Sequence, residues 1–193
     1  MDFRALPSGD LTLTNLTAPG CLTGSDKALE SITLSIRARR ITAPAADLPQ
    51  IDMGGAMVFP TFTDMHTHLD KGHIWPRAAN PDGTFDGALS MVEADRTANW
   101  TGPDVRARMD FGLRCAFAHG TRAMRTHLDS IAPQHRISFP EFTRLREEWA
   151  GRIDLQAACL TLIDRIDPDG GGAFAELADL VAASRGVLGC VPF

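Results

Sequence analysis

The sequence predicts an α/β fold in which strands and helices alternate, preceded by a small β-rich segment. Over residues 58–193, apolar runs of strand length alternate with stretches whose apolar residues recur every three or four positions. Within residues 1–57, two short stretches instead alternate apolar and polar residues with a period of two. Alternating strands and helices are typical of right-handed βα units that build a parallel sheet. The sequence contains about three such units and the start of a fourth.

The β-rich segment has two clear period-two stretches. They cover residues 11–14 and 32–36, and each predicts a short, half-buried strand. Proline and glycine at residues 19–20 predict a turn between them. We therefore expect a small β unit that ends near residue 57.

The second segment predicts seven elements in order. They are a strand from Met57 towards His68, a helix over 103–118, a strand over 123–128, a helix from Ser138 to Gly151, a strand over 153–163, a helix over 173–184 and a strand from Val187. The intervening residues 71–102 carry no clear helical pattern and predict a long loop.

Two helices carry the clearest local signals. The helix over 103–118 places its apolar residues on one face, namely Val105, Met109, Leu113, Ala116 and Phe117. In the next helix, Ser138 is followed three positions later by Glu141, which is the pattern of an N-terminal capping box. We expect His135, just before it, to lie in a surface loop.

Composition excludes several classes of protein. The chain has 19 basic and 24 acidic residues, so its net charge is 19 − 24 = −5, which argues against a nucleic-acid-binding face. Neither a membrane-spanning apolar run nor a secretory signal pattern is present in the sequence. No two of its four cysteines form a C-x-x-C pair. We expect a cytoplasmic protein without nucleic-acid or membrane partners.

The sharpest chemical feature is an H-x-H motif formed by His66 and His68, directly after an apolar run. Residues i and i+2 of a strand point to the same side, so the two imidazoles should lie together. They fall near the carboxyl end of the first parallel strand, which is where α/β folds build their sites. Imidazole suits zinc and iron, although a catalytic site takes three or more protein ligands. The motif therefore predicts part of a divalent metal site.

Three segments of the sequence together resemble the N-terminal portion of a known family. Residues 55–70 carry the H-x-H motif, residues 120–129 contain the sequence Arg-Thr-His-Leu-Asp, and residues 152–156 end in Gln156. They resemble the first, second and third barrel strands of the amidohydrolase superfamily, and in particular its cytosine deaminase-like branch.

The resemblance implies a (β/α)8 TIM-type barrel that hydrolyses a cyclic amidine-like base such as cytosine and releases ammonia. It implies one divalent metal ion, iron or zinc, with His66 and His68 as ligands. Gln156 would hydrogen-bond the nitrogen heterocycle, because its amide offers both a donor and an acceptor. Residues 1–57 would form part of the family's small β-sandwich, and residues 58–193 the first three to four βα units of the barrel.

The length is too small for the whole barrel, which alone takes about 250 residues. The family's catalytic acid and base residues and its remaining metal ligands would lie beyond residue 193. We therefore expect the 193-residue chain to be a fragment without deaminase activity of its own. The full-length protein is a candidate homo-oligomer.

Alternatives remain open at this point. Another ring, such as a triazine or a cyclic amide, could be the substrate, or the chain could be a non-catalytic product. His127 with Arg125 and Asp129 predicts a structural polar network near the barrel mouth rather than a substrate contact. Asp70 and Lys71, which follow the H-x-H motif, are expected to orient its loop.

Overall fold

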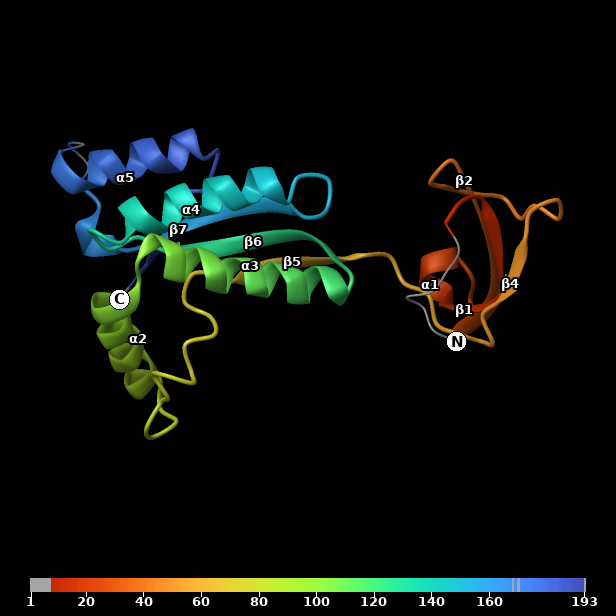
Figure 1. Ribbon diagram of the computed structural model, residues 1–193, viewed down its shortest axis with the longest axis horizontal. Helices are drawn as coiled ribbons and strands as arrows, with labels where there is room; N and C mark the ends of the chain where they lie inside the picture. The colour runs from red at the N-terminus through yellow and green to blue at the C-terminus, as the bar shows by residue number, and fades with distance from the viewer. Residues whose placement is uncertain (1–7, 168, 170, 193) are drawn as a thin grey trace. The chain divides into compact units, whose positions relative to one another are not determined.

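A computed structural model describes residues 8–167, 169 and 171–192 of the chain. The chain divides into two compact units, one ending at Pro60 and the other beginning at Thr61. Both units are drawn in Figure 1, and each is described by itself below.

The first unit is a mixed sheet with the strand order β3-β2-β1-β4. Its strands are β1 (Leu11–Pro19), β2 (Leu29–Arg37), β3 (Arg40–Thr42) and β4 (Gln50–Asp52). β1 and β2 are antiparallel and contain the two period-two stretches, whereas β4 runs parallel to β1. A short helix, α1 (Gly20–Thr23), occupies the position of the expected turn. Leu11, Leu16 and Ala18 of β1 are buried, so this strand supplies much of the unit's core.

The second unit is a parallel sheet with the strand order β5-β6-β7-β8 (Figure 1). Its elements are β5 (Phe62–Thr67), α2 (Phe85–Asn99), α3 (Gly102–Ala118), β6 (Thr121–Asp129), α4 (His135–Glu148), β7 (Asp154–Leu162), the 3-10 turn η2 (Ile163–Arg165), α5 (Gly172–Ala183) and β8 (Cys190–Val191). Consecutive parallel strands joined by helices are the first units of a (β/α)8 barrel, so the predicted fold class is confirmed.

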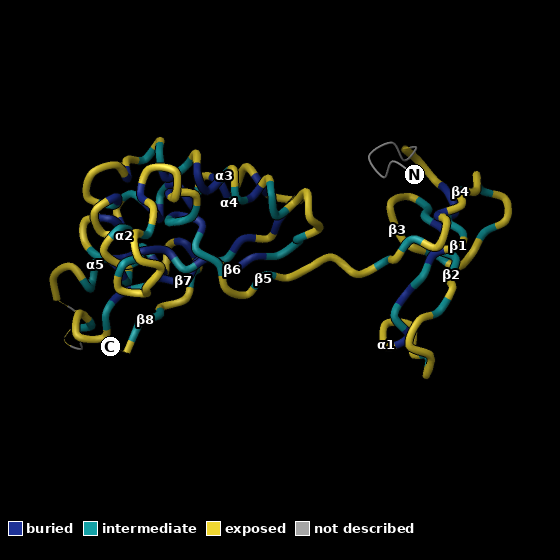
Figure 2. The backbone as a smooth tube through the Cα atoms, turned by 90° about the horizontal axis from the view of Figure 1, so that it is seen from below, coloured by how far each residue is buried: buried dark blue, intermediate teal, exposed yellow. Residues whose placement is uncertain are grey.

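The core of this unit lies between the sheet and helices α3, α4 and α5. Val105, Met109 and Leu113 of α3 are fully buried, as the helical pattern predicts. Alternate residues of β6 and β7 meet them from the sheet, which gives the dark blue stretches of Figure 2. Within the described ranges, no helix combines the length and apolar character that crossing a membrane requires.

Helix α2 corrects the expectation of a long loop over residues 71–102. Its N-cap is Thr84, whose hydroxyl accepts a hydrogen bond from the Gly87 amide at 3.0 Å, and Asp86 lies in its first turn. Asp95 is its one residue classed as buried, so the helix has no broad apolar face. The missing apolar stripe explains why periodicity did not predict it.

The start of helix α4 is a second correction. The helix begins at His135, so Ser138 lies inside its first turn and is not the N-cap. The Ser138 hydroxyl is fully buried and donates to Asp70, 68 residues away in sequence. His135, expected in a surface loop, is 1% exposed. A tertiary contact therefore replaces the local capping pattern at this helix.

Three smaller expectations also need correction. β5 begins at Phe62, and the residues from Met57 to Thr61 precede it. Phe117, placed on the buried face of α3, is 49% exposed. The last strand covers only Cys190–Val191, with a single isolated bridge at Val187. For the two strands, the end of the element is set by pairing with neighbours and not by apolar character alone.

Candidate metal centre

The two histidines of the H-x-H motif lie together at the carboxyl end of β5. His66 is in the strand and His68 is the residue directly after it, beside the parallel strand β6. Their Nε2 atoms are 3.3 Å apart and their rings are 5.2 Å apart between centroids. The sequence prediction that the two imidazoles face the same side agrees with this geometry.

The separation of the two nitrogens fits a shared metal ion. Two nitrogens bound to one tetrahedral Zn²⁺ at about 2.0–2.1 Å lie about 3.3–3.4 Å apart. His68 Nδ1 lies 3.1 Å from the His127 carbonyl oxygen, which can only accept, so Nδ1 carries the proton. The His68 Nε2 lone pair is therefore free to bind a cation, and a backbone carbonyl is a common orienting partner of a metal-binding histidine.

The protonation state of His68 also suits a ligand. Burial, followed by the positive charge of Lys71, lowers the pKa of His68 to about 4. The imidazole is thus neutral near pH 7, as a metal ligand must be. In the described part of the chain, no group of three or more His, Cys, Asp or Glu side chains is arranged to hold a metal ion. The histidine pair is accordingly a partial ligand set.

A third imidazole, that of His127 in β6, packs beside this pair. Its ring centroid is 4.2 Å from that of His66, with an angle of 30° between the planes. Burial, and then the nearby His66, lower the pKa of His127. The expected network of His127 with Arg125 and Asp129 does not form, because those two residues bond to other partners. His127 belongs to the histidine cluster instead.

Asp70 joins the loop after the H-x-H motif to the end of β6. It is fully buried, and its Oδ2 accepts hydrogen bonds from the Asp129 amide at 2.8 Å and the Ser138 hydroxyl at 3.1 Å. Burial, and then the negative charge of Asp129, raise the pKa of Asp70 to about 7. The expectation that Asp70 orients this loop agrees with these contacts.

Asp129 in turn forms salt bridges with two basic side chains. Lys71 Nζ lies 2.9 Å from its Oδ1 and Arg96 Nη1 lies 3.1 Å from its Oδ2. Lys71 therefore ties the same loop to β6, while Arg96 comes from helix α2. Neither the contact of Arg96 with Asp129 nor that of Ser138 with Asp70 could be predicted, because no local signal marks a partner so distant in sequence.

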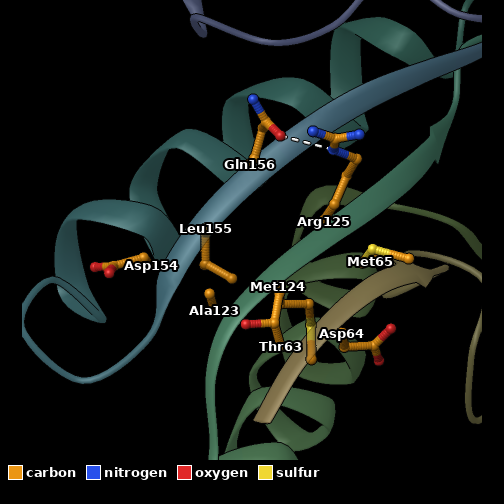
Figure 3. Close-up of a pocket in the computed structure, with 9 residues that line it drawn as sticks. All are labelled: Thr63, Asp64, Met65, Ala123, Met124, Arg125, Asp154, Leu155 and Gln156. Carbon is orange, nitrogen blue, oxygen red and sulfur yellow. Dashed lines mark hydrogen bonds between the residues drawn. The ribbon is translucent and has the colours of Figure 1, made fainter. Parts of the chain in front are cut away.

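Gln156 lies in a pocket of about 410 Å³ on the face of the sheet opposite the helices (Figure 3). Its Oε1 accepts a hydrogen bond from Arg125 Nε at 2.6 Å, drawn as the dashed line. Gln156 pairs with Arg125, whereas Ala158 pairs with His127. The Gln156 amide therefore lies two residues along the strand from the level of His127, towards the amino ends of the strands. Its contact with substrate stays a prediction.

Comparison with known proteins confirms the resemblance to the amidohydrolase superfamily and its cytosine deaminase-like branch. The chain is 57% identical over 150 residues to a pterin deaminase from Rhizobium rhizogenes, a match that covers 78% of this chain and 34% of that protein. The chain therefore spans about a third of this curated relative. No family model matches the chain.

Solved structures show the same fold. A 5-methylcytosine deaminase from Klebsiella pneumoniae superposes with a TM-score of 0.62 at 24% identity, over 90% of this chain and 40% of that one. An N-isopropylammelide isopropylaminohydrolase from Burkholderia multivorans superposes with a TM-score of 0.63 at 24% identity. The match covers 91% of this chain and 43% of that one. An atrazine chlorohydrolase from Arthrobacter aurescens, solved in complex with zinc, superposes with a TM-score of 0.58 at 17% identity. The match covers 95% of this chain and 47% of that one.

Proposed function

We propose that this chain is the N-terminal part of a metal-dependent hydrolytic deaminase acting on an amino-substituted nitrogen heterocycle. The observation that carries the proposal is the pair of Nε2 atoms of His66 and His68, 3.3 Å apart at the carboxyl end of the first barrel strand. In such a reaction, a ring carbon gains an oxygen from water and loses its amino group as ammonia.

The chemistry divides between the cation and the protein. A bound divalent cation lowers the pKa of water and so provides a nucleophile near neutral pH. His66 and His68 would hold the cation, and the His127 carbonyl accepts the Nδ1 proton of His68, which leaves Nε2 for the site. Gln156, whose Oε1 is bonded to Arg125, has its amide N–H groups left to donate to a ring nitrogen or carbonyl.

Pterin is the substrate we propose first. The resemblance in the sequence suggested cytosine, but 57% identity with a pterin deaminase favours the larger ring. Both rings carry an amino group on a carbon next to a ring nitrogen, so the same chemistry serves either. The triazine alternative has the support of fold similarity alone.

A chimera tests this function. In it, the present chain replaces the matching segment of the Rhizobium rhizogenes pterin deaminase, and ammonia release is measured with pterin and with cytosine. We expect turnover of pterin in preference to cytosine, and a loss of at least about 10³-fold in kcat/KM in His66→Ala and His68→Ala chimeras. A folded, metal-loaded chimera that deaminates neither ring would contradict the proposal.

The same chimera tests the role of Gln156. If its amide bonds the ring, Gln156→Leu should lower kcat/KM about tenfold or more while leaving the metal content unchanged. If the amide only joins neighbouring strands through Arg125, kcat/KM should stay as it was and only stability should fall.

We further propose that the 193-residue chain alone is inactive, because two imidazoles are fewer ligands than a catalytic site takes. Ammonia release from pterin by the purified chain should equal that of its His66→Ala variant. Activity above this control would show that the chain is sufficient by itself.

A further inference from the structure

His127 is in contact with both histidines of the H-x-H motif, and through different groups. Its ring packs against the ring of His66, with 4.2 Å between centroids and 30° between planes. Its backbone carbonyl lies 3.1 Å from Nδ1 of His68 and accepts that proton. One residue of β6 thus restrains the orientation of one side chain in β5 and of another directly after it.

The backbone on both sides of His127 is itself held. On one side, the Thr126 hydroxyl accepts a hydrogen bond from the Leu69 amide at 2.9 Å. On the other side, the Asp129 amide donates to the buried Asp70 carboxylate at 2.8 Å. Thr126 and Asp70 are both fully buried, so neither bond competes with water. The His127 carbonyl therefore has little freedom to move away from His68.

We propose that His127 is a positioning residue, whose ring face sets the rotamer of His66 and whose carbonyl sets that of His68 before a metal ion binds. The inference rests on the proposed function of the histidine pair. An exposed histidine ordinarily samples several rotamers, and packing against a flat ring selects one of them. Restraining ligands in advance reduces the entropy that metal binding would otherwise lose.

The contact with His66 uses the face of the ring and not a ring nitrogen. His127 Nδ1 is buried and has no hydrogen-bond partner among the described residues. A flat apolar ring in its place should therefore keep the contact, whereas a small side chain should not. The backbone carbonyl is present in either case, so substitutions isolate the contribution of the ring.

The test measures binding of Co²⁺ and Zn²⁺ to this chain by calorimetry and by the Co²⁺ absorption spectrum. We compare the unsubstituted chain with His127→Phe and His127→Ala, with His66→Ala as the variant lacking a ligand and circular dichroism as the check of folding. We expect His127→Phe to bind within about threefold of the unsubstituted chain, and His127→Ala to bind about tenfold or more weakly.

The possible outcomes are distinct. Equal affinity of His127→Ala and the unsubstituted chain would overturn the positioning role. A loss in His127→Phe as large as in His127→Ala would also overturn it, because a ring nitrogen would then be required. Metal binding no tighter than that of His66→Ala in the unsubstituted chain would refute the proposed metal site itself, and the positioning role with it.

A second measurement needs no substitution, so it stands even if His127→Ala fails to fold. In the metal-free chain, long-range ¹H–¹⁵N spectra should show His68 with its proton on Nδ1. Nuclear Overhauser effects should join ring protons of His66 and His127, whose centroids are 4.2 Å apart. Absence of these effects in the folded chain would overturn the inference.

Discussion

The two faces of the β5–β8 sheet differ in what their side chains do. The packed face, represented by Leu128, Ala157 and Cys159, is buried against the helices. The open face carries Arg125 and Gln156, which bond to each other beside a pocket. Strand alternation places the two sets on opposite sides of the same strands. One face therefore stabilises the unit, and the other carries Gln156, for which we predict a contact with substrate.

The largest effect should come from truncating the packed face. Leu128→Ala, at a side chain with no exposed area, should lower the free energy of unfolding by about 2–5 kcal/mol because it leaves a cavity. Met65→Ala is the matched control, since Met65 lines the open-face pocket and is 74% exposed. It should change stability by about 0.5 kcal/mol or less in chemical denaturation. Similar losses for both variants would show that the open face is also packed in solution.

A smaller effect should come from the buried Thr126 hydroxyl, which joins the packed side of β6 to the chain after β5. Thr126→Val keeps the shape of the side chain but leaves the buried Leu69 amide without its acceptor. We expect a loss of about 1–3 kcal/mol, measured by chemical denaturation. Thr126→Ser retains the hydroxyl and should recover most of that loss. A Val variant as stable as the Ser variant would show that water or another group replaces the bond.

The smallest effect should lie outside both faces, at the start of helix α2. Thr84→Ala removes the acceptor for the Gly87 amide and should lower the free energy of unfolding by about 1 kcal/mol. Thr84→Ser, which preserves the cap, should stay within a few tenths of a kcal/mol. Thermal unfolding of both variants measures the difference, and equal midpoints would mean that α2 does not depend on its N-cap.

Much of this architecture could be predicted because the information is local. The helix α3 and the strands β6 and β7 follow from apolar periodicity, since each buries one face against the same core. The two-residue repeat of a strand predicts that His66 and His68 lie close together, and they do, although β5 ends at Thr67 and its register with β6 shifts between Asp64 and Thr67. By contrast, α2 could not be predicted from periodicity because it has no apolar stripe. Ser138 matches the capping pattern, but its hydroxyl bonds to Asp70 and does not cap the helix.

The sequence by itself determined the alternation of strands and helices except for α2, and it placed His66 and His68 together at the carboxyl end of β5. Only the tertiary structure decided which groups surround that pair. His127 meets His68 across 59 residues, and Asp70 meets Ser138 across 68. Such contacts depend on the register between parallel strands and on where the following helix packs. No local pattern encodes either, because the register is set by the combined burial of side chains from several elements.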